Sequence, residues 1–70
     1  MAQRSLNEME HNCFMYLHTL RESGAVNMLG STPYLVRDMG IDETTARGVL
    51  ALWMKYFNRE GEYDDLMIDA

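Results

Sequence analysis

The sequence predicts a small all-α domain of three helices, followed by a flexible acidic tail. Apolar residues recur every three or four positions in two long stretches, the pattern of an amphipathic helix. A shorter stretch between them begins with Thr-Pro and ends at a glycine. The 70-residue chain is 47% apolar, enough for one small core. We expect helices at about residues 6–22, 33–39 and 43–58 in one domain, 1–58, and a tail at 59–70.

The first helix is expected to begin after Ser5. Ser5 and Glu8 have the spacing of a capping box, in which each side chain bonds the other residue's backbone N–H. Ser23–Gly24 supplies a C-terminal stop, and residues 25–30 are expected to form a tight connector. The apolar face of this helix comprises Leu6, Met9, Cys13, Tyr16, Leu17 and Leu20.

The second and third helices are separated by a glycine turn. Thr32 before Pro33 predicts a hydroxyl N-cap with proline at the first helical position. Gly40 is the expected left-handed residue that ends the second helix. Asp42 is expected to cap the third helix, and Glu43 suits the positive end of its dipole.

The third helix carries one apolar face and one unexpected glycine. Trp53 is the expected centre of the core, on a face that comprises Ala46, Val49, Leu50, Trp53 and Phe57. Gly48 costs roughly 1 kcal/mol relative to alanine inside a helix. A close approach by another backbone would explain it.

Charge divides the chain into two parts. Residues 1–58 carry five basic and six acidic residues, whereas residues 59–70 carry one basic and five acidic residues. We expect the tail to be flexible until it meets a partner. Tyr63, Leu66 and Met67 have helical spacing, which suits a short amphipathic turn formed on binding.

Nothing in the sequence indicates catalysis, a cofactor or a metal site. Cys13 is the only cysteine and lies on the apolar face of the first helix, while His11 does not. His11 and His18 are two helical turns apart, roughly 10 Å along the axis, which is too far to share one ion. No apolar run approaches the ~18 residues of a membrane span, and the N-terminus lacks a signal peptide. We expect a non-enzymatic cytoplasmic protein.

Residues 33–58 have the layout of a helix-turn-helix, which is one functional hypothesis. A DNA-binding regulator of this kind would use Arg37, Thr44, Thr45, Arg47 and Lys55, and the acidic tail would act as an autoinhibitory element. Against this, Asp42 and Glu43 would lie closest to the phosphates, and no basic patch is present.

The turn also resembles part of a protein-binding family. Met39–Gly40–Ile41, followed by Asp42–Glu43 and the helix from Thr44, is similar to the Met-Gly-hydrophobic loop of ubiquitin-associated three-helix domains. Those domains bind partners through that loop and the end of the third helix. The resemblance implies that such a surface can bind protein.

A longer pattern resembles short proteins encoded by tailed bacteriophages. The pattern covers about half the chain and comprises Glu22–Ser23–Gly24, Asn27–Met28–Leu29–Gly30, Pro33–Tyr34–Leu35, Gly40, Ala46, Leu50, Trp53–Met54 and Phe57. Leu29 stands where those proteins more often have Phe. The resemblance implies a setting, the cytoplasm of an infected bacterium, and no chemistry.

The main functional prediction is a phage-type accessory protein, an adaptor or inhibitor, that binds a host or phage protein. The expected contact residues lie on the third helix and the tail: Arg47, Ala51, Lys55, Tyr63, Leu66 and Met67. Seven methionines give an adaptable apolar surface. A homodimer is also considered, because a small core gains from burying a second face, with Phe14, Met15 and Met54 as interface candidates.

Overall fold

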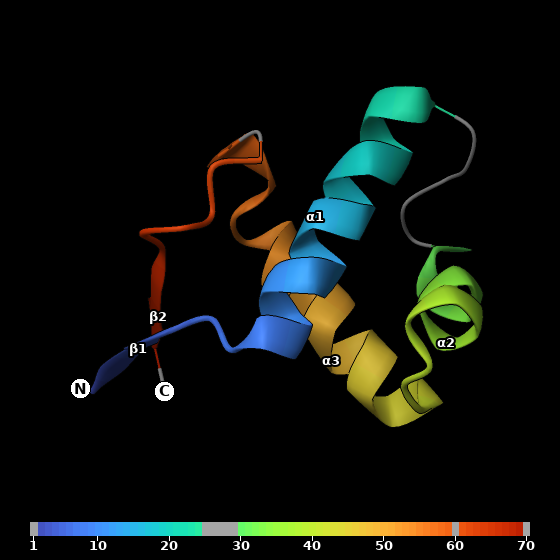
Figure 1. The fold of residues 1–70 in the computed structure, drawn as a ribbon, viewed down its shortest axis with the longest axis horizontal. Coiled ribbons are helices and arrows are strands. Elements are labelled where there is room, and N and C mark those ends of the chain that lie inside the picture. Colours follow the sequence, from blue (N-terminus) through green and yellow to red (C-terminus); the bar gives the residue numbers. More distant parts are fainter. Residues whose placement is uncertain (1, 25–29, 60, 70) are drawn as a thin grey trace.

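The computed structural model describes residues 2–24, 30–59 and 61–69, and it is mostly helical. The described elements are β1 (Gln3–Ser5), α1 (Glu8–Ser23), α2 (Thr32–Met39), α3 (Glu43–Met54), the 3₁₀ helix η2 (Phe57–Arg59) and β2 (Met67–Asp69) (Figure 1). The three α-helices confirm the small all-α domain. The expected form of the connector at residues 25–29 lies outside the described residues, as does the side chain of Phe57.

The core lies where α1 and α3 pack together, and the C-terminal segment adds to it. Trp53 is 1% exposed and Cys13 is fully buried, as expected from their helical spacing. Phe14 is also fully buried, so its expected role in a dimer interface is wrong. Met15 and Met54, the other two candidates, are each 38% exposed.

The first helix begins two residues later than expected, and Ser5 does not cap it. Asn7 is the N-cap: its side chain accepts from the Glu10 backbone N–H at 2.7 Å, and Glu10 accepts from the Asn7 N–H at 3.0 Å. Ser5 lies in β1 instead. Arg4 of β1 reaches the same Glu10 carboxylate through two bonds of 2.6 and 2.8 Å, which fixes the frame of the capping box.

The turn between α2 and α3 forms as predicted. Gly40 has a φ of +68°, in the left-handed region that glycine adopts without strain. Asp42 caps α3 by accepting from the Thr45 backbone N–H at 3.0 Å. The start of α2 differs, because Thr32 is already helical and Ser31 is the N-cap, without a side-chain capping bond.

The third helix is shorter than expected. It ends at Met54 rather than residue 58, and the chain continues through a turn into η2. The expectation of a close neighbour at Gly48 is also wrong. Gly48 is exposed, and a Cβ added there would meet nothing within 4 Å.

The C-terminal segment, residues 61–69, packs against the helices and is not the flexible tail predicted from its charge. Three of its side chains enter the core: Tyr63 is 1% exposed, Leu66 4% and Ile68 1%. The Tyr63 hydroxyl accepts a buried bond from Trp53 Nε1 at 2.9 Å, and its ring meets Phe14 edge-on at 5.2 Å.

The two strands join the ends of the chain. β1 pairs antiparallel with β2, with Gln3 opposite Asp69, Arg4 opposite Ile68 and Ser5 opposite Met67. The described residues near the two termini therefore lie side by side, at the end of the molecule remote from α2 (Figure 1). Within the described residues, no helix is long and apolar enough to cross a membrane.

Candidate protein-binding surface

A groove lies between α2 and the start of α3. It has a volume of about 530 Å³ and is lined by Thr32, Pro33, Val36, Arg37, Glu43 and Arg47. Pro33 and Val36 supply apolar lining, and the charged side chains come from both helices. The groove exists because Gly40 and Asp42 end one helix and start the next within four residues.

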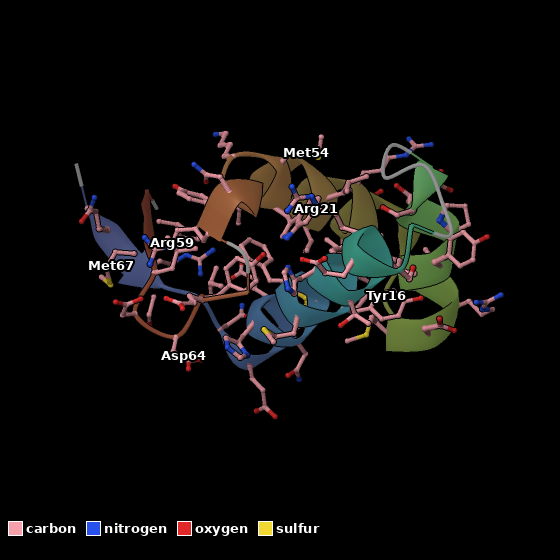
Figure 2. The ribbon with its side chains drawn as sticks, turned by 90° about the horizontal axis from the view of Figure 1, so that it is seen from above. Tyr16, Arg21, Met54, Arg59, Asp64 and Met67 are labelled. Carbon is pink, nitrogen blue, oxygen red and sulfur yellow. The ribbon has the colours of Figure 1, made fainter. Side chains whose placement is uncertain are left out.

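Arg37 is exposed but is held on two sides. Its Nε and one terminal nitrogen donate to the Asp38 carboxylate at 2.9 and 3.3 Å, and its guanidinium lies 5.1 Å from the centre of the Tyr34 ring. Tyr16 of α1 donates its hydroxyl to the same carboxylate, which links α1 to α2. Figure 2 shows Tyr16 between these two helices. Arg37 is thus directed at the groove by a three-residue network.

Ionisation of this network follows from the same contacts. The Arg37 guanidinium, followed by the Tyr16 hydroxyl, holds the pKa of Asp38 below its ordinary value. Burial and the neighbouring carboxylate raise the pKa of Tyr16. Asp38 is therefore a carboxylate and Tyr16 a neutral donor at neutral pH, so the arrangement that holds Arg37 is stable there.

Arg47 faces the groove from α3. It forms an ion pair with Glu43 one turn earlier, and both side chains are largely exposed, 71% and 63%. An exposed pair of this kind is worth little, so Arg47 can exchange Glu43 for a partner group at small cost.

The exposed side of α3 continues from the groove. We call it the α3 face; it comprises Thr44, Arg47, Gly48, Ala51, Met54 and Lys55, all exposed. Arg47, Ala51 and Lys55 are the three predicted contact residues of this helix, and the structure brings them together. Gly48 has no side chain and Ala51 has a methyl group, so no large side chain protrudes from the middle of the face. Met54 adds an exposed apolar side chain at the end of the helix (Figure 2).

The three contact residues predicted in the tail do not join this surface. Tyr63 and Leu66 are buried in the core, so a partner cannot reach them while the segment stays packed. Met67 is 47% exposed, but it lies on β2, at the end of the molecule remote from α2 (Figures 1 and 2).

The residues expected to contact DNA differ in their exposure and in whether a carboxylate accompanies them. Thr44 and Lys55 are exposed and Thr45 is half-buried. Arg37 and Arg47 are each paired with a carboxylate of the same helix. Lys55, the residue that follows α3, has no carboxylate partner among the residues that the structure describes.

Two acidic side chains of the C-terminal segment are paired with basic residues elsewhere. Asp64 meets His11 Nε2 at 2.8 Å, and Asp65 meets Arg59 at 2.9 Å. Neither acid covers Arg37 or Arg47, because the segment lies at the opposite end of the molecule (Figure 1). The arrangement gives no support to a tail that imitates phosphate on α3.

The two histidines of α1 have separate surroundings. His11 meets Asp64, whereas the His18 ring lies beside Gly61, and its Nε2 is 3.7 Å from a carboxylate oxygen of Glu22. Nowhere in the described ranges do three His, Cys, Asp or Glu side chains gather as metal ligands would.

No family model matches this chain, and no curated protein or solved structure resembles it significantly.

Sequence reasoning named two of the six groove residues, Arg37 and Arg47, as candidate contacts and missed the other four. Thr32 and Pro33 were expected only to start the second helix, and Glu43 only to suit the dipole of the third. The short turn between the second and third helices predicts that they diverge from a common corner. The sequence does not show which side chains line that corner, because the lining depends on the angle between the helices.

Proposed function

We propose that this protein is a non-catalytic accessory protein that binds a host or phage protein through the α3 face and the adjoining groove. The observation that carries the proposal is the groove itself, a hollow with apolar and charged lining next to a low helix face. Protein partners favour such surfaces, since an apolar side chain can fill the hollow while the rim forms polar contacts.

The proposed contact surface differs from the one expected from the sequence. The tail residues contribute to the core, so the proposal keeps Arg47, Ala51 and Lys55 and adds Met54 and the groove residues. The phage setting rests on the sequence resemblance alone. It would place the partner in an infected bacterial cell.

DNA binding as a transcriptional regulator is the alternative, and the charges argue against it. Asp38 and Glu43 accompany the two arginines, and Asp42 lies at the start of α3, where phosphates would approach. A DNA reader gains affinity from cations free to replace condensed counterions. In this half of the described chain, Lys55 is the one cation that no carboxylate accompanies, and each arginine brings an acidic neighbour that phosphate would repel.

Photo-crosslinking tests the proposed surface. A photoreactive phenylalanine analogue placed at Ala51 should form adducts with a protein partner in bacterial cells that carry the source phage. The same analogue at Thr19, exposed on α1, is the matched control and should give none of these adducts. Equal adducts from both positions, or none from Ala51 at any stage of infection, would overturn the proposal.

A further inference from the structure

The charges around the α2–α3 groove cancel, which indicates what kind of side chain the groove suits. Pro33 and Val36 supply its apolar lining. Both arginines of the lining, Arg37 and Arg47, are paired with carboxylates of their own helices. A charged group therefore gains no net attraction in the groove. An uncharged, flexible apolar side chain can cover the apolar lining without disturbing the two ion pairs.

Met54 is an exposed side chain of this kind on the same side of α3. It is 38% exposed at the end of the helix, and Figure 2 shows it on the side of α3 remote from α1. Glu43, Arg47 and Met54 are spaced by four and seven residues, so they follow one edge of α3. Glu43 and Arg47 line the groove, whereas Met54 is two turns too far along to line the groove of its own chain.

An antiparallel pair of α3 helices would bring Met54 of each copy to the groove of the other. No large side chain protrudes at Gly48 and Ala51, so two copies can approach closely where Gly48 of one lies opposite Ala51 of the other. In this register Met54 lies opposite the midpoint between Glu43 and Arg47 of the second copy. The two-fold axis that relates such helices keeps the groove edge of both copies on one side of the pair, so the two contacts are identical.

The charges at the two ends of α3 favour the same orientation. Asp42 and Glu43 stand at its start, and Lys55 follows its end. Antiparallel packing places the basic end of one helix beside the acidic start of the other, whereas parallel packing places like charges together. Among the described residues of its own chain Lys55 has no carboxylate partner, so it can make this contact. Exposed contacts of this kind set orientation more than strength.

We propose that the α3 face also joins two copies of this chain in an antiparallel dimer, with Met54 of each copy packed in the α2–α3 groove of the other. The inference goes beyond the proposed function and does not rest on it; a partner protein and a second copy would compete for one surface. One helix face per copy is a small interface, so we expect a dissociation constant on the order of 100 µM. The chain is then monomeric at the low micromolar concentrations used to measure unfolding.

Sedimentation equilibrium of the full chain, between about 10 µM and about 1 mM, tests the dimer. The average mass should rise from that of one chain toward that of two. Met54→Gln should weaken the association at least about tenfold, because a polar side chain gains less from leaving water. Met15→Gln is the matched control: Met15 is also 38% exposed but lies on α1, and its change should alter the association less than about twofold.

Backbone amide signals of the nitrogen-15-labelled chain locate the contact. With rising concentration, those of residues 34–37 and 43–55 should move, and that of Thr19 on α1 should not. A monomer throughout would overturn the inference, as would equal weakening by both methionine variants. Association without movement at residues 34–37 would show that Met54 does not enter the groove. The Ala51 crosslink still tests the proposed function separately, because a second copy gives an adduct of twice the chain mass and a different protein does not.

Discussion

Glu10 is the residue on which the N-terminal part of the fold depends. Its carboxylate accepts from the Asn7 backbone N–H that starts α1 and from both terminal nitrogens of Arg4 in β1. The residue is 7% exposed, so these donors replace most of its water. One side chain thereby ties the first strand to the first helix.

The Glu10 contacts predict how stability depends on pH. The Arg4 hydrogen bond, the largest influence, lowers the pKa of Glu10, and burial opposes it. A lowered pKa means that the contact stabilises the fold fully above about pH 4.3, the unfolded value, and is lost as pH falls through the folded value. Urea unfolding should show Glu10→Gln less stable by about 1–2 kcal/mol at pH 7.

The same experiment at successively lower pH supplies the control. As the pH falls through the lowered pKa of Glu10, the wild-type carboxyl becomes protonated, so the difference between wild type and Glu10→Gln should shrink. A difference that stays constant as the pH falls would show that Glu10 acts through packing rather than charge.

Gly48 gives a second prediction at the scale of one residue. It lies within α3 with a helical backbone, and a Cβ would meet open space. Gly48→Ala should therefore raise the free energy of unfolding by about 1 kcal/mol, because alanine loses less backbone entropy in a helix. Chemical denaturation checks this, and a loss of stability would mean that a close neighbour is present after all.

At the scale of elements, the C-terminal segment is structural. Tyr63, Leu66 and Ile68 fill the core beside Trp53, and β2 completes the two-stranded sheet. A chain that ends at residue 58 would lose all three buried side chains and the strand. Such a truncation is expected to unfold, so it cannot report on the surface of α3.

Tyr63→Phe tests this role with a small change. The phenylalanine ring keeps the edge-on contact with Phe14 but removes the hydroxyl that accepts the buried bond from Trp53 Nε1. Unfolding should become easier by about 0.5–1.5 kcal/mol, the net contribution of one hydrogen bond. Tyr34→Phe, the same change at a half-buried position of α2, is the matched control. If the two variants lose equal stability, the buried Trp53–Tyr63 bond contributes nothing specific.

Local signals predicted the parts of the fold that local contacts form. Gly40 and Asp42 were placed correctly, since a left-handed residue and a cap act within one helical turn. At α1 we expected the frame of Ser5 with Glu8, whereas the structure has a second frame, Asn7 with Glu10. The contact that favours the second frame, from Arg4 in the strand, is not visible in helical spacing.

The C-terminal segment was misjudged because its pairing is distant in sequence. Its acidic residues indicated a solvated tail, yet Leu66 and Ile68 alternate with Met67, the period of a strand. The partner strand lies more than sixty residues earlier, and no local pattern announces such a pair. The groove escaped prediction for the related reason that two helices build it.

At the scale of the whole molecule, the C-terminal acids and the groove are separated. The C-terminal acids lie at one end, where Asp64 and Asp65 have basic partners, and the groove lies toward the other (Figures 1 and 2). Protein binding at α2 and α3 therefore needs no contribution from the acidic segment.

The most direct measurement is fluorescence anisotropy of labelled duplex DNA at 50 mM salt, because it needs no known partner. Both the full chain and the triple variant Glu62→Gln, Asp64→Asn and Asp65→Asn should be measured, since the variant removes acids without removing the core. Our account predicts no saturable binding by either protein. Binding that falls steeply between 50 and 200 mM salt would contradict it, and binding by the variant alone would show that the C-terminal acids are autoinhibitory.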